Sequence, residues 1–289
     1  MEEIQKTRTI AEPGFVEHLT VFVDFIGTSE AAGGWGEAAL SDLTQLLLAV
    51  AQLKGDFVMN VEDKGETKLS TFRPQITTFS DHIVLSYPVS ELAKAVVDSG
   101  AKSDIHILTA LQQVEGIIAQ LAADAMRLGL MIRGGAAIGP LYHSGGAVLG
   151  KAMVEAYELE SKVAVYPRIA VSGSIQAALT QFPGYRIRKD DRDGIVYLDY
   201  FGSMILKSGS GPGPDMMANV KLWLDTTRQR ITQNMEKFAA ESAWNKYAKW
   251  AWFRNELERA LKGINPGLLS EGVKVPTQGV PPSADQLLA

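Results

Sequence analysis

Runs of apolar residues along the chain change period in a way that predicts strands and helices in turn. Residues 19–26, LTVFVDFI, form a continuous apolar, β-branched run that ends at Gly27, which predicts a central strand. Leucine and valine then recur at helical spacing from Leu40 to Leu53, which predicts a helix. The same reasoning predicts strands at 57–61, 76–79, 83–87, 130–138, 168–172, 185–188 and 195–200, and helices at 104–129 and 151–164.

The order of these expected elements indicates the fold class. A strand, a helix, a pair of strands, a second helix, a strand, a helix and a strand are typical of an α+β sandwich with a ferredoxin-like βαββαβ core. Residues 207–214, KSGSGPGP, have the composition of a flexible linker. We therefore expect a folded domain over 16–206, a C-terminal helical extension over 215–262 and an irregular, proline-containing tail over 263–289.

Composition and charge exclude several classes of function. The chain of 289 residues is 46% hydrophobic and 21% charged, as in an ordinary globular protein. Its formal net charge of −5 argues against nucleic-acid binding, and the aromatic C-terminal helices then favour core packing over base stacking. The absence of cysteine excludes disulfides, zinc–thiolate sites and thiol nucleophiles. No signal-like segment or bilayer-length apolar run is visible, so we expect a cytoplasmic protein without direct membrane contact.

Two aspartates carry the strongest chemical signal. Asp24 lies in the middle of an apolar strand, where a carboxylate is costly unless it is paired, hydrogen-bonded or bound to a metal. Asp81 lies at the tip of the hairpin between 76–79 and 83–87. Taken singly, Asp24 is also explained as a core residue held by backbone donors, and Asp81 as a turn residue. Together, two carboxylates on adjacent strands can hold two Mg²⁺ or Mn²⁺ ions.

The stretch after Asp24, from Ile26 to Ser29, is small and turn-forming. Its backbone N–H groups, at Gly27 and Thr28 in particular, can cradle phosphates, although an ordinary strand-to-helix turn has the same composition. The chain has no HExxH, GxxxxGKS or GxSxG motif. Metalloprotease, P-loop NTPase and serine hydrolase activities therefore lack support.

Several segments resemble, in order, the signature segments of class III nucleotidyl cyclases. VFVDFIGTS resembles the first strand with its metal-binding aspartate, and FSDHIVLSY resembles the hairpin with the second. LMIRGGAAIGPLYH resembles the strand before the dimerisation arm, and GAVLGKAMVEAYELE resembles the glycine-led helix after it. The resemblance spans roughly residues 16–200. With YPRIAVS and KYAKWAWFRN included, it is closest to the pyrimidine cyclases of bacterial Pycsar antiphage systems.

The resemblance implies the class III cyclase homology domain, a homodimer with active sites at its interface, and two Mn²⁺ or Mg²⁺ ions per site. Asp24 and Asp81 would bind both ions, and the backbone carbonyl of Phe25 would complete one coordination shell. Tyr142 and His143 would belong to the dimer arm. The implied reaction converts UTP to 3′,5′-cyclic UMP and pyrophosphate. The product would act on a separate cyclic-nucleotide effector in antiphage defence.

Departures from the family pattern bear on substrate and activity. Adenylate cyclases carry an asparagine and an arginine on the glycine-led helix, where this chain has Val154 and Glu158. Their adenine-reading lysine and aspartate map to Thr77 and Ala147. These replacements favour a pyrimidine base, with Thr77 as a base contact by position and Asn60 as another polar candidate. They leave open a cyclase that makes cyclic CMP or cyclic AMP, and a degenerate cyclase-like module that binds a nucleotide without catalysis.

The remaining expected nucleotide contacts are three cations and one aromatic ring. Arg133, Lys151 and Arg168 lie at motif positions. They are expected to meet the triphosphate, or else to form salt bridges with acids such as Glu155, Glu158 or Glu160. Phe22 shares a strand face with the first aspartate, so it would pack against the bound base or belong to the core.

Overall fold

The computed structural model describes residues 14–28, 37–51, 57–63, 66–98, 105–182, 184–185, 187–210 and 215–264. Its strands are β1 (Val16–Ile26), β2 (Phe57–Asp63), β3 (Glu66–Phe72), β4 (Gln75–Phe79), β5 (His82–Pro88), β6 (Met131–Ser144), β7 (Ala147–Gly150), β8 (Ile169–Val171), β9 (Ile187–Lys189) and β10 (Val196–Leu198). Its helices are α2 (Glu37–Ala51), α3 (Val89–Asp98), α4 (Ile105–Leu128), α5 (Lys151–Glu158), the π-helical turn η1 (Leu159–Val163), α6 (Gly173–Leu179), α7 (Phe201–Ser208), α8 (Met216–Ala240) and α9 (Trp244–Ile264).

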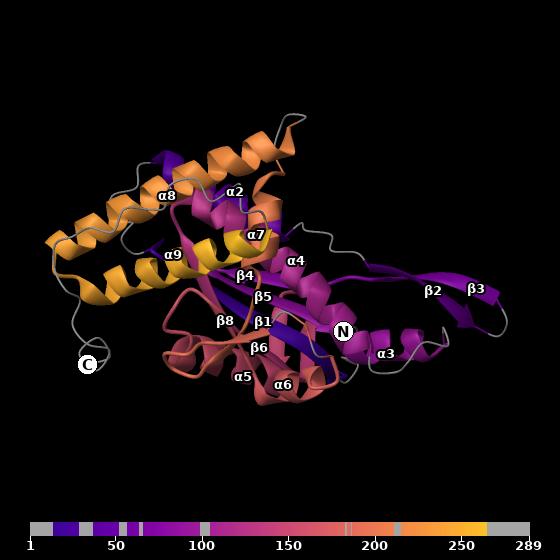
Figure 1. The fold of residues 1–289 in the computed structure, drawn as a ribbon. Coiled ribbons are helices and arrows are strands. Elements are labelled where there is room, and N and C mark those ends of the chain that lie inside the picture. Colours follow the sequence, from indigo (N-terminus) through magenta and orange to yellow (C-terminus); the bar gives the residue numbers. More distant parts are fainter. Residues whose placement is uncertain are drawn as a thin grey trace, which may run out of the picture.

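A mixed sheet forms the centre of the molecule (Figure 1). Its strands lie in the order β4-β5-β1-β6-β8-β10-β9, and β7 pairs with the end of β6. β1 runs antiparallel to both of its neighbours, whereas β6 and β8 are parallel. The order β4-β5-β1-β6, with α2 and α4 in the connections, is the split βαβ arrangement of a ferredoxin-like core. The predicted α+β class is therefore confirmed, and the β2–β3 ribbon extends away from this body (Figure 1).

β1 is buried over most of its length because helices cover both sides of the sheet. Figure 1 shows α4, α8 and α9 on one side and α5 and α6 on the other. Leu19, Val21 and Val23 belong to the main core, which includes residues of α4. Phe22 lies on the other face, in a small cluster with Ala156 of α5. Burial of both strand faces explains why this segment reads as a continuous apolar run without alternation.

A glycine pair in β6 determines how closely α5 approaches the sheet. A Cβ atom on Gly135 would lie 2.1 Å from the carbonyl oxygen of Ala156. A Cβ atom on Gly134 would lie 2.3 Å from the carbonyl oxygen of Phe22. Any larger residue would therefore force β1, β6 and α5 apart. Since the pair directly follows Arg133, this close packing also holds the residues after α5 beside the Arg133 side chain.

The C-terminal helices complete the same core. Trp223 of α8 donates from Nε1 to the carbonyl oxygen of Ala123 in α4 at 3.1 Å. Trp252 of α9 is fully buried and stacks on Tyr166 with ring centroids 5.9 Å apart. The aromatic residues of this region therefore pack in the core, as the sequence predicts. None of the helices in the described part of the chain is both long enough and apolar enough to cross a membrane.

The structure adds β3, β7, α3, α6 and α7 to the elements expected from the sequence. α7 includes the first residues of the segment expected to be a linker, because Phe201, Met204 and Ile205 are buried at helical spacing. Residues 211–214 of that segment, and the expected irregular tail beyond Ile264, lie outside the described residues. The prediction of a linker is therefore wrong for residues 207 and 208, which are helical.

Candidate metal centre

Asp24 lies where three neighbouring strands place polar side chains in one row. In the antiparallel register it stands opposite His82 of β5 on one side and Arg133 of β6 on the other. The Asp24 side chain is 13% exposed, so solvent reaches it only in part. Directly paired residues on adjacent strands have side chains within contact distance. The sheet register alone therefore brings an acid, an imidazole and a guanidinium together.

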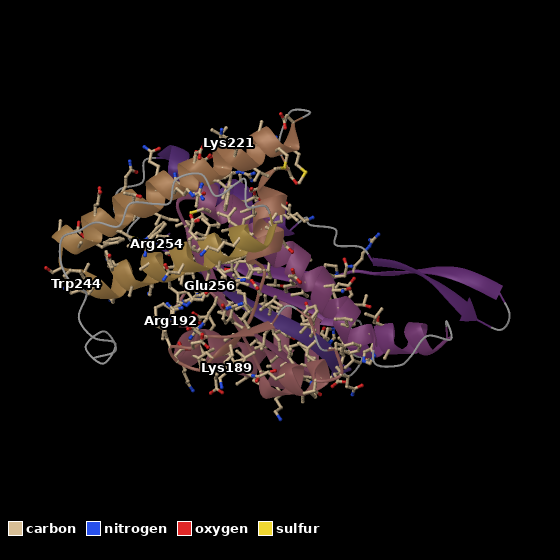
Figure 2. All side chains as sticks on the ribbon, viewed as in Figure 1. Lys189, Arg192, Lys221, Trp244, Arg254 and Glu256 are labelled. Carbon is tan, nitrogen blue, oxygen red and sulfur yellow. The ribbon has the colours of Figure 1, made fainter. Side chains whose placement is uncertain are left out.

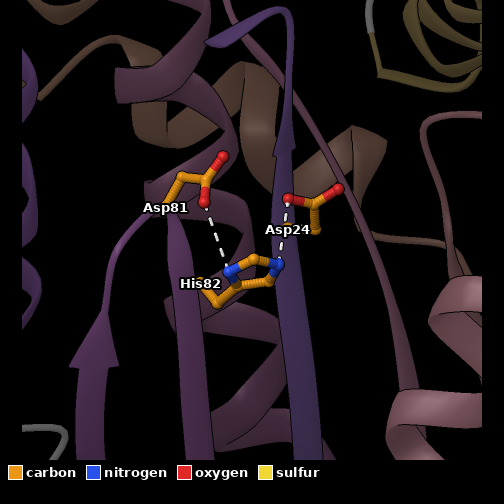
Figure 3. Close-up of side chains that lie close together, drawn as sticks. All are labelled: Asp24, Asp81 and His82. Atoms are coloured by element: carbon orange, nitrogen blue, oxygen red, sulfur yellow. Dashed lines mark ion pairs between the residues drawn. The ribbon is translucent and has the colours of Figure 1, made fainter. Parts of the chain in front are cut away.

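His82 lies between the two aspartates that the sequence singles out (Figure 3). Its Nε2 is 3.6 Å from Asp24 Oδ1, and its Nδ1 is 3.2 Å from Asp81 Oδ1. One possible ligand atom from each of the three side chains lies within 4.8 Å of the others. The structure thus places Asp24 and Asp81 within joint reach of a metal ion, and it adds a histidine to the pair.

Short hydrogen bonds orient the Asp81 carboxylate. Thr28 donates from Oγ1 to Asp81 Oδ2 at 2.8 Å, and Ser80 donates from Oγ to Asp81 Oδ1 at 3.0 Å. Ser80 adopts a left-handed conformation with φ 54°, which turns the chain into β5. Burial alone would raise the pKa of Asp81, but these hydrogen bonds and the nearby His82 bring it below its usual value. Asp81 is therefore held as an oriented, ionised carboxylate.

Arg133 joins Asp24 to a second buried acid. Its Nε and Nη2 lie 3.0 Å and 2.9 Å from Asp24 Oδ2, and its Nη2 lies 2.8 Å from Glu160 Oε1. Glu160 lies in η1 and is 3% exposed. Burial raises the pKa of Glu160, the Arg133 guanidinium opposes that rise, and the negative charge of Asp24 adds to it. Arg133 thus forms the salt bridge with Glu160 that the sequence analysis held as the alternative to triphosphate contact.

The donor set fits a divalent cation. The carboxylates of Asp24 and Asp81 face each other beside the guanidinium of Arg133, so with a neutral His82 negative charge is in excess even when Glu160 is protonated. Carboxylate oxygens are the ligands that Mg²⁺ and Mn²⁺ prefer. His82 adds an imidazole nitrogen as a possible third ligand beside the two carboxylates. Asp24, Asp81 and His82 are therefore the side chains that would hold the metal.

Two expected nucleotide contacts have partners inside the protein. Arg168 is fully buried, and its guanidinium donates to Asp190 and Asp193, so it offers no surface to a triphosphate. Phe22 is 2% exposed, and its ring packs edge-on against Tyr157 with centroids 5.5 Å apart. Its role is that of a core residue under α5 rather than a contact for a base.

Thr77, the expected base contact, belongs to a buried polar chain. Its Oγ1 shares a hydrogen bond of 2.9 Å with Nε2 of His143, whose Nδ1 lies 2.8 Å from Ser86 Oγ. His143 is 5% exposed, and burial together with His18 lowers its pKa to about 4. A neutral imidazole can accept one of these two hydrogen bonds and donate the other. The side chain of His143 is thus internal, although it lies in the hairpin expected to form the dimer arm.

The remaining expected site residues are Phe25 and Gly27, close to Asp24 along the chain, and Lys151, which begins α5 near the other end of β6. Gly27 ends β1 with φ 107°, a conformation that favours glycine, and Phe25 is 2% exposed. Metal binding by the Phe25 carbonyl stays a prediction. Lys151 is exposed at the first position of α5. Further along, Glu158 pairs with Lys162 at 2.7 Å rather than pointing into the centre.

From the sequence, His82 has no assigned role, and Glu160 is named only as one of several acids that could pair with a motif cation. His82 was within reach of pattern analysis, because an antiparallel hairpin with Asp81 at its tip puts the next residue opposite Asp24. The inward position of Glu160 could not be predicted in this way, because the helical pattern of the sequence continues past Glu158 and gives no sign of the π-helical turn. That turn changes the helical phase after Leu159 and directs Glu160 inward.

Comparison with known proteins adds matches among solved structures only. No protein family and no curated protein matches the chain. The adenylyl cyclase CyaB from P. aeruginosa is 15% identical, with 63% of this chain and 92% of that chain covered and a TM-score of 0.35. A bacterial light-regulated adenylyl cyclase is 15% identical over 75% of this chain and 59% of that chain, with a TM-score of 0.33. An adenylate/guanylate cyclase/hydrolase from Silicibacter pomeroyi is 13% identical over 64% and 95%, with a TM-score of 0.33. Identities of 13–15% and TM-scores of 0.33–0.35 are too low to assign a function to this chain.

Proposed function

We propose that the chain is a metal-dependent nucleotidyl cyclase that converts UTP to 3′,5′-cyclic UMP and pyrophosphate. The observation that carries this proposal is the meeting of Asp24 and Asp81, from different strands, with His82 between them. Two acids held in this way can position divalent ions against a triphosphate. The ordered resemblance of the surrounding segments to class III cyclases supports the same reaction.

In the proposed reaction the ribose 3′-oxygen attacks the α-phosphorus of the nucleotide. The bond from that phosphorus to the bridging oxygen breaks, pyrophosphate leaves, and the proton of the 3′-hydroxyl passes to solvent. Divalent ions, when bound, supply positive charge to the phosphate oxygens. The protein's part is positioning and electrostatics, because phosphoryl transfer of this kind needs little covalent chemistry from side chains.

The contacts of the two aspartates suit this positioning role. Arg133 occupies Oδ2 of Asp24, which leaves Oδ1 turned toward His82. Asp81 accepts one hydrogen bond on each oxygen, from Thr28 on Oδ2 and from Ser80 on Oδ1. Both carboxylates are therefore oriented before a ligand arrives, which lowers the reorganisation needed during the reaction.

Exposed apolar side chains support a homodimer with its sites near the interface. Leu149 of β7 is 64% exposed, and Val154 and Tyr157 of α5 are 57% and 50% exposed. Val154 and Tyr157 lie three residues apart on α5 and so share a helix face, and exposed apolar side chains on one face are typical of a surface that binds another protein. Tyr157 packs on Phe22, two residues from Asp24, so a second copy bound here would lie close to the metal centre.

The choice of UTP rests on the resemblance and on the side chain at one position. Thr77 offers a hydroxyl, already bonded to His143, where adenylate cyclases have a lysine. A hydroxyl can donate or accept, so it suits a uracil carbonyl or ring N–H. The proposed role of the product as a signal to a separate effector in antiphage defence rests on the resemblance alone.

The proposal is tested by product identification. Purified protein is incubated with Mn²⁺ and an equal mixture of ATP, GTP, CTP and UTP, and the products are identified by mass spectrometry. Cyclic UMP as the main product is the expected result. Cyclic CMP or cyclic AMP would replace the UTP assignment while keeping the cyclase. No cyclic product from any of the four nucleotides would refute the enzyme.

A nucleotide-binding module without catalysis is the second candidate. Two observations favour it: Val154 is 57% exposed where the family has asparagine, and Glu158 pairs with Lys162 where the family has arginine. Equilibrium binding of a nucleoside triphosphate with no release of pyrophosphate would select this candidate. Turnover of any nucleotide would exclude it.

A further inference from the structure

Glu160 is a buried acid that has no part in the proposed reaction. It is 3% exposed and is the second residue of η1. The backbone N–H of Ala164 bonds to the carbonyl oxygen of Leu159, five residues earlier, at 2.8 Å, which is the π-helical pattern. Single π-helical turns inside a helix occur frequently at functional sites. The side chain that this turn directs inward is therefore a candidate for a functional role.

The sheet holds the π-helical turn beside Arg133. A Cβ atom on Gly135 would lie 2.5 Å from the Cβ atom of Leu159, so the backbone of β6 packs directly against the start of η1. Gly135 follows Arg133 by two residues on β6, so the two positions share one face of the sheet. This packing brings Glu160 to the guanidinium of Arg133.

The contacts of Glu160 are not those of an acid that stabilises the fold. In the other arginine–carboxylate cluster, Asp190 accepts hydrogen bonds from both Arg168 and Trp252. Oε1 of Glu160 is buried, yet among the described residues it accepts no hydrogen bond of good geometry. Its contact with Arg133 Nη2, at 2.8 Å, is one of charge. A buried carboxylate oxygen without an aligned donor costs free energy, so a gain other than stability is expected.

Glu160 and Asp24 share one group of Arg133. Nη2 of Arg133 lies 2.9 Å from Asp24 Oδ2 and 2.8 Å from Glu160 Oε1. A guanidinium stays protonated in proteins, so its positive charge is divided between the two carboxylates. Without Glu160, the whole of that charge would act on Asp24.

The charge of Arg133 opposes the binding of a metal ion at the centre. Oδ2 of Asp24 contacts Arg133, and Oδ1 of the same carboxylate faces His82. A divalent ion held there would share one carboxylate with a guanidinium, and two cations on one carboxylate repel each other. A second acid beside Arg133 offsets this repulsion and leaves in place the hydrogen bond that orients Asp24.

We propose that Glu160 is a positioning residue of the metal centre. It neutralises Arg133, so that Asp24 is oriented by a guanidinium and still binds a divalent cation. This inference rests on the metal centre of the proposed function, and it does not depend on which nucleotide is turned over.

The test measures Mn²⁺ binding by the full chain without nucleotide, from the loss of the electron paramagnetic resonance signal of free Mn²⁺. Glu160→Gln keeps an acceptor for Arg133 but removes the negative charge, so Mn²⁺ affinity should fall about tenfold. Arg133→Gln should not lower the affinity. The double variant removes both charges, so it should bind Mn²⁺ within about threefold of the unaltered chain. A role confined to packing predicts instead that the double variant binds most weakly.

Two matched controls remove the same charges elsewhere. Glu158→Gln removes a negative charge two residues away, from an exposed carboxylate paired with Lys162. Lys221→Gln removes a positive charge from α8, on the other side of the sheet from α5 (Figure 2). Both controls should bind Mn²⁺ as the unaltered chain does.

Circular dichroism and urea unfolding establish which variants are folded. If Glu160→Gln alone is not, the double variant is compared with Arg133→Gln, and it should bind Mn²⁺ more weakly because it lacks the charge of Glu160. Unchanged Mn²⁺ affinity in a folded Glu160→Gln variant would overturn the proposal, as would a double variant no tighter than Glu160→Gln. No binding of Mn²⁺ by the unaltered chain would also overturn it.

Turnover, measured separately, distinguishes this inference from the proposed reaction. A chain that turns over no nucleotide, yet shows the expected order of Mn²⁺ affinities, would refute the cyclase and leave the role of Glu160 in place. A chain that makes a cyclic nucleotide, with equal Mn²⁺ affinity in Glu160→Gln, would keep the cyclase and remove Glu160 from the metal centre.

Discussion

Two clusters of arginine and carboxylate lie on the same sheet and differ in how completely they are closed. Around Arg168 the guanidinium is fully buried and donates to Asp190 and Asp193, each at 3.0 Å. Arg192 and the indole of Trp252 add donors to Asp190 at 2.8 Å and 2.7 Å. Burial alone would raise the pKa of Asp190, but these hydrogen bonds bring it down to about 2. Every strong charge in this cluster has an opposite partner inside the protein.

Around Arg133 acidic and basic groups are not matched in this way. Two aspartates and a histidine lie beside one guanidinium, and the side chains of Asp24, Arg133 and His82 are 13%, 27% and 31% exposed. Negative charge remains uncompensated, and solvent can reach it. Arg133 and Arg168 both lie at positions of the resembling segments. What separates a ligand site from a structural ion pair is therefore the ratio of acidic to basic groups and the exposure of the side chains to solvent, rather than position in a motif.

Replacement of Asp24 by asparagine should have the largest effect on activity. The change removes the negative charge that would hold a metal, so turnover should fall by roughly 10³-fold or more. Stability should change little, because the amide can still accept from Arg133. The measurement is the rate of pyrophosphate release with Mn²⁺, alongside the urea midpoint. Turnover within a factor of ten of the unaltered chain would remove Asp24 from the centre, and Asp81→Asn is the companion variant.

The same substitution in the closed cluster should act on stability instead. Asp190→Asn leaves the buried Arg168 short of an ionic partner, which should cost about 3–5 kcal/mol of unfolding free energy. Urea unfolding at pH 7 measures this loss. Any activity that survives at a temperature where the variant is folded should be near that of the unaltered chain. A loss below about 1 kcal/mol, as for an exposed pair, would contradict the description of this cluster as closed.

Acid should weaken the closed cluster in a defined pH window. The pKa of Asp190 is about 2 in the folded chain and near 3.9 in an unfolded one, so its stabilisation is complete above about pH 4. It is lost as the pH falls from there through 2, and amounts to about 3 kcal/mol. Urea midpoints of the unaltered chain and of Asp190→Asn, measured between pH 5 and pH 2, should therefore converge. Parallel curves would show that Asp190 does not titrate as described.

The smallest of these effects is expected at Arg133. Arg133→Gln keeps a donor for Asp24 but removes the charge, so the carboxylate is oriented less firmly, and turnover should fall about tenfold. The apparent Mn²⁺ affinity should not fall, because a competing cation has been removed. Activity measured across a Mn²⁺ titration separates these two quantities. A variant that loses metal affinity together with turnover would show that Arg133 acts on the metal site as a whole.

The sequence predicts the two aspartates of the metal centre better than it predicts the residues and elements around them. Asp24 and Asp81 were identifiable because a carboxylate in an apolar strand, and another at a hairpin tip, stand out from their local patterns. The burial of Arg168 could not be predicted from the sequence. Its partners Asp190 and Asp193 lie in a turn whose position depends on contact with Trp252. The helix over 201–208 was hidden by the glycine- and serine-rich residues that follow it, although Phe201 and Met204 show helical spacing.

The π-helical turn after α5 makes this region sensitive to chain length. Glu160 reaches Arg133 only because η1 accommodates one more residue per turn than an α-helix would. Deletion of a single residue there would restore α-helical phase and rotate the following side chains by about 100° around the helix axis. Arg133 would then keep Asp24 as its acidic contact and lose the one from η1. A length change of one residue, with no substitution at the metal centre, would thereby alter its charge.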